Sequence, residues 1–233
     1  MKSVFITGAN RGLGYGFVEY LTDNGWQVFG GVRKITPSLP NRENLFWIQI
    51  DISDDASIMR AVAGVKRHVS AIDLLINNAG VNKDTATHNH KEKVCTLQDL
   101  ERGALQKMFN INSISPLIVL QQFLPLLTHN PSFVINISSR RASFQNESEK
   151  EYANYGYRAS KVALNMITAC SVQDVPSTLR TFSVHPGNVR TEMNPDGEDD
   201  PKTQAKKIIA ITESWNENWN GKFMRYDGTL YPI

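Results

Sequence analysis

The sequence has few cysteines and almost no excess of either charge, and each shortage excludes a class of protein. Two cysteines among 233 residues, Cys95 and Cys170, cannot form a framework of disulfides and are typical of a reducing compartment. Lys and Arg together number 25 and Asp and Glu 23, a formal net charge of +2, which gives no strong attraction to nucleic acid or to an anionic membrane. We therefore predict neither a disulfide-stabilised scaffold nor a nucleic-acid-binding protein.

Long apolar runs are also missing. The longest, residues 114–127, is interrupted by two prolines and two glutamines and is too short to cross a bilayer. The first ten residues, MKSVFITGAN, become glycine-rich after a short apolar run, unlike a secretory leader. With 41% hydrophobic and 21% charged residues, the composition is that of a folded globular chain. We expect a cytoplasmic protein without a membrane span.

Six short, largely apolar runs predict buried strands of a parallel sheet that is covered on both faces. They are Val4–Ile6, Val28–Phe29, Phe46–Ile48, Leu74–Ile76, Phe133–Ile135 and Phe182–Val184. Helical segments separate them, at 14–23, from Asp54 or Asp55 toward His68, at 112–127 and at 157–173. No repeat and no linker divides the chain. We predict an α/β fold with one Rossmann-fold domain over residues 1–233, a doubly wound, mainly parallel sheet, helices on both faces and right-handed crossovers.

A glycine-rich segment, TGANRGLG at Thr7–Gly14, follows the first predicted strand and opens the first helix. Glycines let the backbone turn tightly and approach a pyrophosphate, whose charge is met by free N–H groups at the helix N-terminus. An ordinary glycine turn between strand and helix is the alternative, which this position disfavours. The segment predicts a dinucleotide site that includes Gly8, Asn10, Arg11, Gly12, Leu13 and Gly14.

Carboxylates are absent where a preference for NAD(H) would need one. Between Asp23 and Glu43 the chain has no Asp or Glu, and Arg33 and Lys34 follow the second strand. A carboxylate there binds the ribose hydroxyls of NAD, whereas NADP needs positive charge for its 2′-phosphate, which an arginine can bind bidentately. Unless these are solvated loop charges, the cofactor is NADP(H) in preference to NAD(H), bound in part by Arg33.

Tyr157 and Lys161 are four residues apart and share one face of a predicted helix. A phenol is a useful proton donor near neutral pH only if its pKa falls from about 10 toward 7, which requires about 4 kcal/mol of differential stabilisation. An adjacent ammonium group supplies charge of the right sign. Tyr152 and Tyr155 have no lysine at the fourth position, so the pattern selects Tyr157.

Further motifs follow other predicted strands: Asn77-Asn78-Ala79-Gly80, Ile137-Ser138-Ser139 and His185-Pro186-Gly187. With the glycine segment and Tyr157–Lys161, they make the sequence resemble the classical short-chain dehydrogenase/reductase family, from Thr7 to about Asp227. The details Asn-Arg-Gly-Leu-Gly, Tyr-Arg-Ala-Ser-Lys, His-Pro-Gly-x-Val-x-Thr and Tyr226-Asp227-Gly228 look closest to the carbonyl-reductase and C-factor-like branch.

The resemblance implies roles for four residues. Tyr157 would be the general acid/base, Lys161 would bind the nicotinamide ribose and lower the tyrosine pKa, and Ser139 would hydrogen-bond the carbonyl oxygen. Ser138 is the alternative to Ser139, since neighbouring residues of a strand face opposite sides. Asn112 would hold a water of the proton relay, with Asn110 or a helix-capping role as alternatives.

The same resemblance implies about seven strands and further cofactor contacts. Besides Tyr157 and Lys161 themselves, these would come from Asp51, Ile52, Asn78, Ala79, Gly80, Pro186, Gly187, Val189 and Thr191. Asp51 could equally cap the next helix. Three segments without a motif, 81–103, 145–154 and the acidic 194–203, are expected to be loops that determine substrate choice.

The implied function is NADPH-dependent reduction of a ketone or aldehyde, a small-molecule substrate, and the alternative is an NADP(H)-binding signalling protein of C-factor type. Members of the family often form dimers or tetramers, and some are monomers, so the resemblance leaves open whether this protein forms a homo-oligomer. We expect no metal at His88 and His90, a core position for Cys170, and packing, an oligomer contact or a substrate wall at Trp215 and Trp219.

Overall fold

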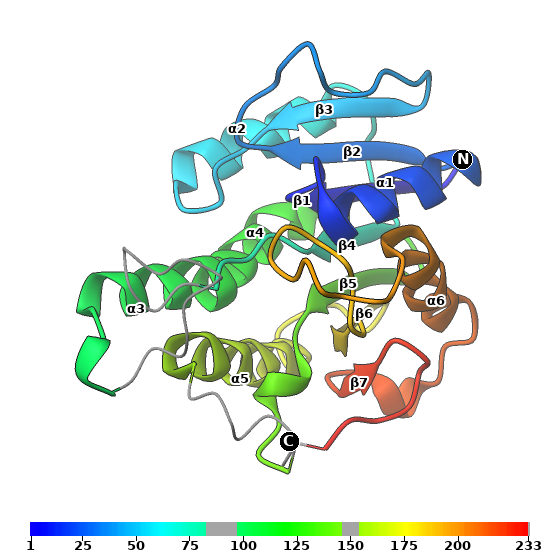
Figure 1. Cartoon of the computed structure of the whole chain (residues 1–233). Coiled ribbons are helices and arrows are strands. Elements are labelled where there is room, and N and C mark those ends of the chain that lie inside the picture. Colours follow the sequence, from blue (N-terminus) through cyan, green and yellow to red (C-terminus); the bar gives the residue numbers. More distant parts are fainter. Residues whose placement is uncertain (83–96, 146–153, 233) are drawn as a thin grey trace.

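A seven-stranded sheet runs through the part of the chain that the structure describes, residues 1–82, 97–145 and 154–232 of a computed structural model (Figure 1). Every pairing is parallel, and the strand order is β3-β2-β1-β4-β5-β6-β7. The strands are β1 Ser3–Thr7, β2 Gln27–Val32, β3 Leu45–Gln49, β4 Leu74–Asn77, β5 Ser132–Ile137, β6 Leu179–His185 and β7 Phe223–Arg225. The predicted doubly wound sheet is confirmed, and its first six strands contain the six apolar runs.

Residues along the central strands alternate between two separate cores. In β1, Val4 and Ile6 belong to one buried cluster and Phe5 to the other. Successive side chains of a strand point to opposite faces, and β1 and β5 are buried at every position. Burial on both faces explains why these strands read as continuous apolar runs in the sequence.

Helices cover both faces of the sheet (Figure 1). α1 (Gly12–Asp23) and α6 (Pro201–Glu213) complete the core on one face, and α2 (Asp55–Lys66) and α4 (Ser115–Phe123) complete it on the other. α5 (Tyr155–Ser171) packs against β6 and against the short α3 (Arg102–Phe109). Short helical turns complete the described part: η1 Leu97–Asp99, the π-helical η2 Asn110–Ile114, η3 Leu124–Leu126, η4 Arg140–Ala142 and η6 Glu217–Trp219.

The last crossover has the opposite hand to the first. The chain moves toward the β3 edge from β1 to β2 and toward the β7 edge from β6 to β7, yet α1 and α6 cover the same face. Two parallel connections that run in opposite directions over one face have opposite hands. With β1–α1–β2 in the usual right-handed form, β6–α6–β7 is left-handed, and the expectation of right-handed crossovers is wrong at this connection.

This connection brings the N-terminus of α6 directly onto α1. A Cβ atom at Gly16 of α1 would lie 2.5 Å from the carbonyl carbon and oxygen of Pro201, the first residue of α6. Such a separation leaves no room for any side chain on α1 at this point. Glycine at position 16 is therefore what lets the two helices meet at this end of the sheet.

The sequence pattern misses α3 and α6. α3 buries only Met108 among its eight residues, so it carries almost no apolar stripe. α6 starts inside the acidic segment 194–203, which was expected to be a loop, although Asp200 caps it by accepting a hydrogen bond from the Thr203 N–H at 2.8 Å. The predicted helix 112–127 is instead a π-helical turn, α4 and a 3₁₀ turn in succession.

Cys170 is exposed, which corrects the expectation of a core position. The buried stripe of α5 includes Leu164, Thr168 and Ser171, and Cys170 lies beside it. Trp215 and Trp219 pack edge to face with ring centroids 5.9 Å apart, against the core between the sheet and α6. Within the described residues, none of the helices has the length and apolar composition that a membrane span requires.

We predict that Gly16→Ala destabilises the fold by about 1–3 kcal/mol, the usual range for overpacking a closed interior, because the new methyl group meets the Pro201 backbone. Urea unfolding of the variant measures this free energy. Gly103→Ala is the matched control: no atom lies within 4 Å of a Cβ at that helical glycine, so its stability should stay equal or rise. Equal effects of the two substitutions would contradict the packing argument.

Candidate active site

The glycine segment forms a tight turn between β1 and α1. Gly8 and Gly12 adopt left-handed backbone conformations, with φ of +65° and +53°. A Cβ atom at Gly14 would lie 2.1 Å from the Gly8 carbonyl oxygen, so the first turn of α1 sits directly on the end of β1. Leu13 is buried in the core and Asn10 is exposed. The free N–H groups at the start of α1 are thus placed at the carboxyl edge of the sheet, where a phosphate can approach.

The segment after β4 is tied to this turn by hydrogen bonds. The Asn78 side-chain amide donates to the carbonyl oxygens of Thr7 (3.0 Å) and Gly8 (3.1 Å). The backbone N–H groups of Asn78 and Ala79 both donate to the buried Thr7 hydroxyl, at 3.0 and 3.1 Å. Asn78 therefore holds the glycine turn in place through its side chain. Thr7 is a positioning residue that sequence reasoning missed, although a hydroxyl one residue before the first glycine was a usable signal.

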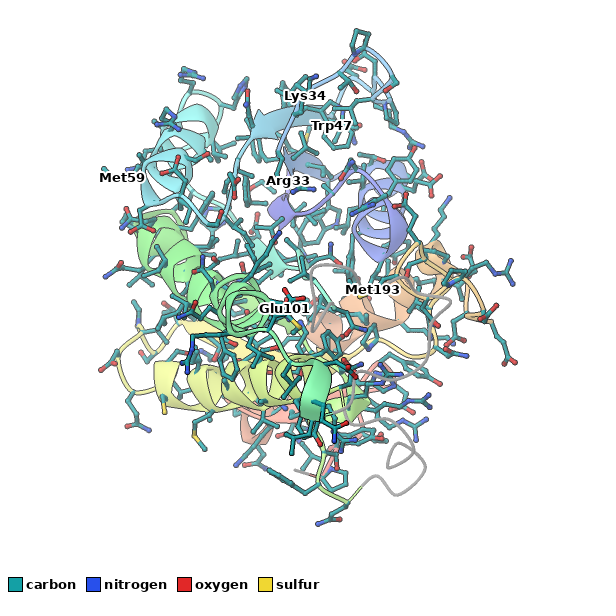
Figure 2. All side chains as sticks on the ribbon, turned by 60° about the vertical axis from the view of Figure 1, so that its left-hand side comes forward. Arg33, Lys34, Trp47, Met59, Glu101 and Met193 are labelled. Atoms are coloured by element: carbon teal, nitrogen blue, oxygen red, sulfur yellow. The ribbon has the colours of Figure 1, made fainter. Side chains whose placement is uncertain are left out.

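Positive charge follows β2, as predicted. Arg33 and Lys34 are exposed, and in the view of Figure 2 Arg33 lies between Lys34 and the middle of the molecule. Hydrogen bonds from Ser53 lower the pKa of Asp51, and the nearby Arg33 guanidinium lowers it further. Asp51 does not cap α2, because Asp54 fills that position by accepting the Ala56 N–H at 3.0 Å. Ile52, beside Asp51, is buried in the core.

The segment after β6 passes over the glycine turn. Thr191 lies against Gly12, where its Cγ2 atom would be 3.0 Å from an added Cβ. The neighbouring Glu192 carboxylate forms an ion pair with Arg11 of the glycine turn. Both side chains are more than half exposed, so this ion pair contributes little to stability. Arg11 thus already has a carboxylate partner at the place where we predict a cofactor phosphate.

Lys161 carries its ammonium group into the interior beside Tyr157. The Lys161 side chain is 4% exposed, and its Nζ donates to the Ile137 carbonyl oxygen at 2.7 Å. Nζ lies 5.8 Å from the centroid of the Tyr157 ring, one helical turn earlier on α5. Burial lowers the pKa of Lys161 to about 8, so near pH 7 most of the population remains charged.

Asn112 lies in the π-helical turn η2 and faces the same space. It is fully buried; its Oδ1 accepts the Val81 N–H at 2.9 Å, and its Nδ2 donates to the Val81 carbonyl at 2.9 Å and to the Ser160 hydroxyl at 3.0 Å. These bonds exclude the helix-capping alternative for Asn112. An added Cβ at Gly80 would lie 3.3 Å from Asn112 Oδ1 and 3.7 Å from Lys161 Nζ, so the three residues border one another. π-helical turns are frequent at functional sites.

The two serines after β5 differ in accessibility. Ser138 is 3% exposed, and its hydroxyl has no hydrogen-bond partner among the described residues. Ser139 is half-buried; its hydroxyl accepts the Arg141 N–H at 3.2 Å and caps the short helix η4. A hydroxyl that accepts this bond keeps its own proton available for donation. Of the pair, Ser139 is the one that a ligand can reach.

The remaining predicted contacts follow β6. Pro186 and Gly187 are partly accessible, Val189 is buried, and Gly187 has a φ of +96°. The structure brings this segment, the glycine turn and the Tyr157–Lys161 pair to the carboxyl edge of the sheet. His88 and His90, and most of the two segments 81–103 and 145–154, lie outside the described residues. In the described part, no group of three or more potential ligands is placed to hold a metal ion.

A model of one protein family, described as short chain dehydrogenase, matches residues 2–202. The chain belongs to the short-chain dehydrogenase family. This confirms the resemblance seen in the motifs, and the chain is accordingly an oxidoreductase of that family.

Several relatives of this short-chain dehydrogenase carry more specific names. The crystal structure of an NADPH-bound carbonyl reductase from chicken fatty liver superposes with a TM-score of 0.86 at 28% identity, covering 100% of this chain and 99% of that one. Carbonyl reductase Sniffer of Drosophila melanogaster superposes with a TM-score of 0.87 at 27% identity and covers 100% of both chains. C-signal of Myxococcus xanthus is 31% identical over 164 residues, 69% of this chain and 92% of that protein. These names match the branch indicated by the motifs.

The buried lysine leads to a prediction about stability. Since the pKa of Lys161 is about 8 in the fold and about 10.4 in an unfolded chain, the unfolded state binds more protons between these values. The free energy of unfolding should therefore rise with pH in that window, by about 3 kcal/mol if the whole shift is realised. Urea unfolding at about pH 7 and about pH 10 measures the rise.

In Lys161→Met this rise should disappear, while the exposed Lys66→Met variant should keep it. Other titrating groups are common to all three proteins and cancel in the comparison. A wild-type rise that survives in Lys161→Met would show that Lys161 keeps an ordinary pKa.

Proposed function

We propose that the protein is an NADPH-dependent reductase of ketones or aldehydes, with a small-molecule carbonyl compound as its substrate. The observation that carries the proposal is the buried Lys161 ammonium beside Tyr157. A protein that only bound a dinucleotide could use the lysine to bind the ribose, but it would have no chemical need for a tyrosine paired to that lysine. The similarity to the carbonyl reductases of chicken fatty liver and Drosophila melanogaster supports the same function.

The residues at the carboxyl edge fit a dinucleotide phosphate. The glycines let the turn pack closely against Ala79 and Thr191, and the start of α1 offers N–H groups that no side chain caps. Arg33 and Lys34 supply positive charge where a preference for NAD(H) would place a carboxylate. We assign the cofactor contacts proposed from the sequence to this edge, with Asn78 and Gly14 acting by shaping the turn.

In the reaction we propose, bound NADPH supplies a hydride for the carbonyl carbon. Ser139 donates its hydroxyl proton in a hydrogen bond to the carbonyl oxygen and stabilises the charge that develops there. The Tyr157 hydroxyl then gives its proton to that oxygen, and alcohol oxidation runs the same steps in reverse. The Lys161 ammonium favours the resulting phenolate by its positive charge. We assign Asn112 to holding the relay through which Tyr157 is reprotonated.

A second candidate function is cofactor-dependent signalling with little turnover, which the 31% identity to C-signal favours. The two candidates differ in turnover. A broad panel of ketones and aldehydes, assayed by NADPH oxidation, should give at least one substrate if the first proposal is right. Tight NADPH binding without turnover, together with a protein partner, would favour the second.

Tyr157→Phe tests the proton donor. We expect NADPH oxidation to fall by at least about 100-fold, the usual contribution of a positioned acid, while NADPH binding measured by fluorescence changes little. Tyr155→Phe is the matched control, because Tyr155 is 42% exposed on the same helix, and it should retain turnover. Full activity of Tyr157→Phe would overturn the proposed mechanism.

Arg33→Ala tests the preference for NADPH. Losing a charge-assisted contact to the 2′-phosphate should weaken NADPH binding by roughly 10- to 100-fold and leave NADH binding almost unchanged. Titration calorimetry with both cofactors measures the two dissociation constants. Arg60→Ala, which removes an exposed arginine of α2, should affect neither. Equal losses for NADPH and NADH in Arg33→Ala would show that the phosphate contact is misassigned.

A further inference from the structure

Gln204, in the first turns of α6, carries a buried side-chain amide that has no hydrogen-bond partner in the described part of the chain. Its side chain is 0% exposed, and neither Nε2 nor Oε1 has a partner among the described residues. An unsatisfied buried polar group destabilises the fold, and an apolar group of the same shape removes that cost. Such groups are rare in native structures, and each calls for a physical explanation.

The amide lies against the cofactor-facing segment that follows β6. At Gly187, an added Cβ would be 2.2 Å from Gln204 Nε2 and 2.6 Å from Asp199 Oδ2. That carboxylate oxygen accepts the Asn188 N–H at 2.7 Å. The φ of +96° at Gly187 turns the chain at this point, directly before Val189 and Thr191. Gln204 and Asp199 therefore both lie beside Gly187. The turn at Gly187 directs residues 188–191 toward the glycine-rich turn before α1.

Gln204 reaches this position because α6 lies beside α1. The left-handed β6–α6–β7 connection places the first turn of α6 against Gly16 of α1. The buried side of α6 therefore faces the interior, beside the segment that follows β6, and not the solvent. Being fully buried, Gln204 cannot touch the cofactor. It can act only through Gly187, Asn188 and Asp199.

We infer that Gln204 is a positioning residue for the cofactor: its Nε2–H donates to the Asp199 carboxylate when the segment 186–191 closes on the bound dinucleotide. Both groups border the Gly187 turn, so a movement of this turn onto the cofactor can bring the amide within reach of the carboxylate. The Asp199 carboxylate then accepts hydrogen bonds from both Gln204 and the Asn188 N–H, and the two bonds together hold the turn in place. Because the bond forms in the bound state, it contributes to cofactor affinity and not to the stability of the free protein. The inference rests on the cofactor binding proposed above.

Gln204→Met is the decisive variant, because methionine keeps the length of the side chain and removes the amide. We expect its melting temperature without cofactor to equal or exceed that of the wild type. Its NADPH dissociation constant, measured by calorimetry, should rise about tenfold, the loss expected for one hydrogen bond. The KM for NADPH should rise with it while kcat stays nearly unchanged.

Trp215→Phe is the control, since Trp215 also buries an N–H without a partner in the described part, but beside Phe133 at the start of β5. Whatever it does to the melting temperature, NADPH affinity should not change. A double-mutant cycle of Gln204→Met with Asp199→Asn adds a readout that a purely structural role would not move: the two losses of NADPH affinity should be far from additive.

The outcomes separate the inference from the proposed function. If wild-type protein binds neither NADPH nor NADH, the proposed function fails. If the wild type binds NADPH and Gln204→Met binds it equally well, the inference alone fails. A lower melting temperature in Gln204→Met, with NADPH affinity unchanged, would show that the amide is structural and would also overturn it.

Discussion

Lys161 carries its ammonium group to a place that water hardly reaches, and the surrounding backbone has to compensate for the lost hydration. The Ile137 carbonyl, at the end of β5, is the partner that the fold provides. Its position is fixed by the sheet, while the lysine is fixed by α5, so the charge is held between two rigid elements. Gly80 leaves the space beside the ammonium open. The phenol of Tyr157 meets a cation whose place is set by the whole sheet and not by a flexible surface chain.

Much of this arrangement could be read from the sequence, because the strands are buried on both faces. Continuous apolar runs identified six strands, and the residues that follow them were expected at one edge. The Tyr157–Lys161 spacing identified a shared helical face. Both signals depend only on residues that are close together in the sequence, so they can be read without knowing the fold.

Other features depend on contacts between distant segments and leave little trace in the chain. α6 was missed because its capping residue, Asp200, stands in an acidic stretch typical of a loop. The buried amide of Gln204 lies in a helix that was not expected, next to a turn 17 residues earlier in the chain. The link between Asn78 and Thr7 joins β4 to β1, and only the strand order β1–β4 brings them together. The roles of the site residues remain proposals that geometry supports.

The left-handed connection to β7 decides which helix ends meet at the candidate site. A right-handed crossover would have put α6 on the opposite face, with α2 and α4. Instead α1 and α6 begin side by side, and the segment between β6 and α6 has to pass over the glycine turn to reach its helix. That route explains why Thr191 and Glu192 lie on Gly12 and Arg11.

The π-helical turn at Asn110–Ile114 also constrains how this protein can change in evolution. Such a turn holds one residue more than a regular helix, and residues of a helix are rotated by about 100° from one to the next. Losing a single residue upstream of Asn112 would restore regular winding between α3 and α4, but would swing the amide away from Val81 and Ser160. The extra residue of the turn therefore sets the position of Asn112. A deletion inside the turn would cost the hydrogen bonds of Asn112 to Val81 and Ser160.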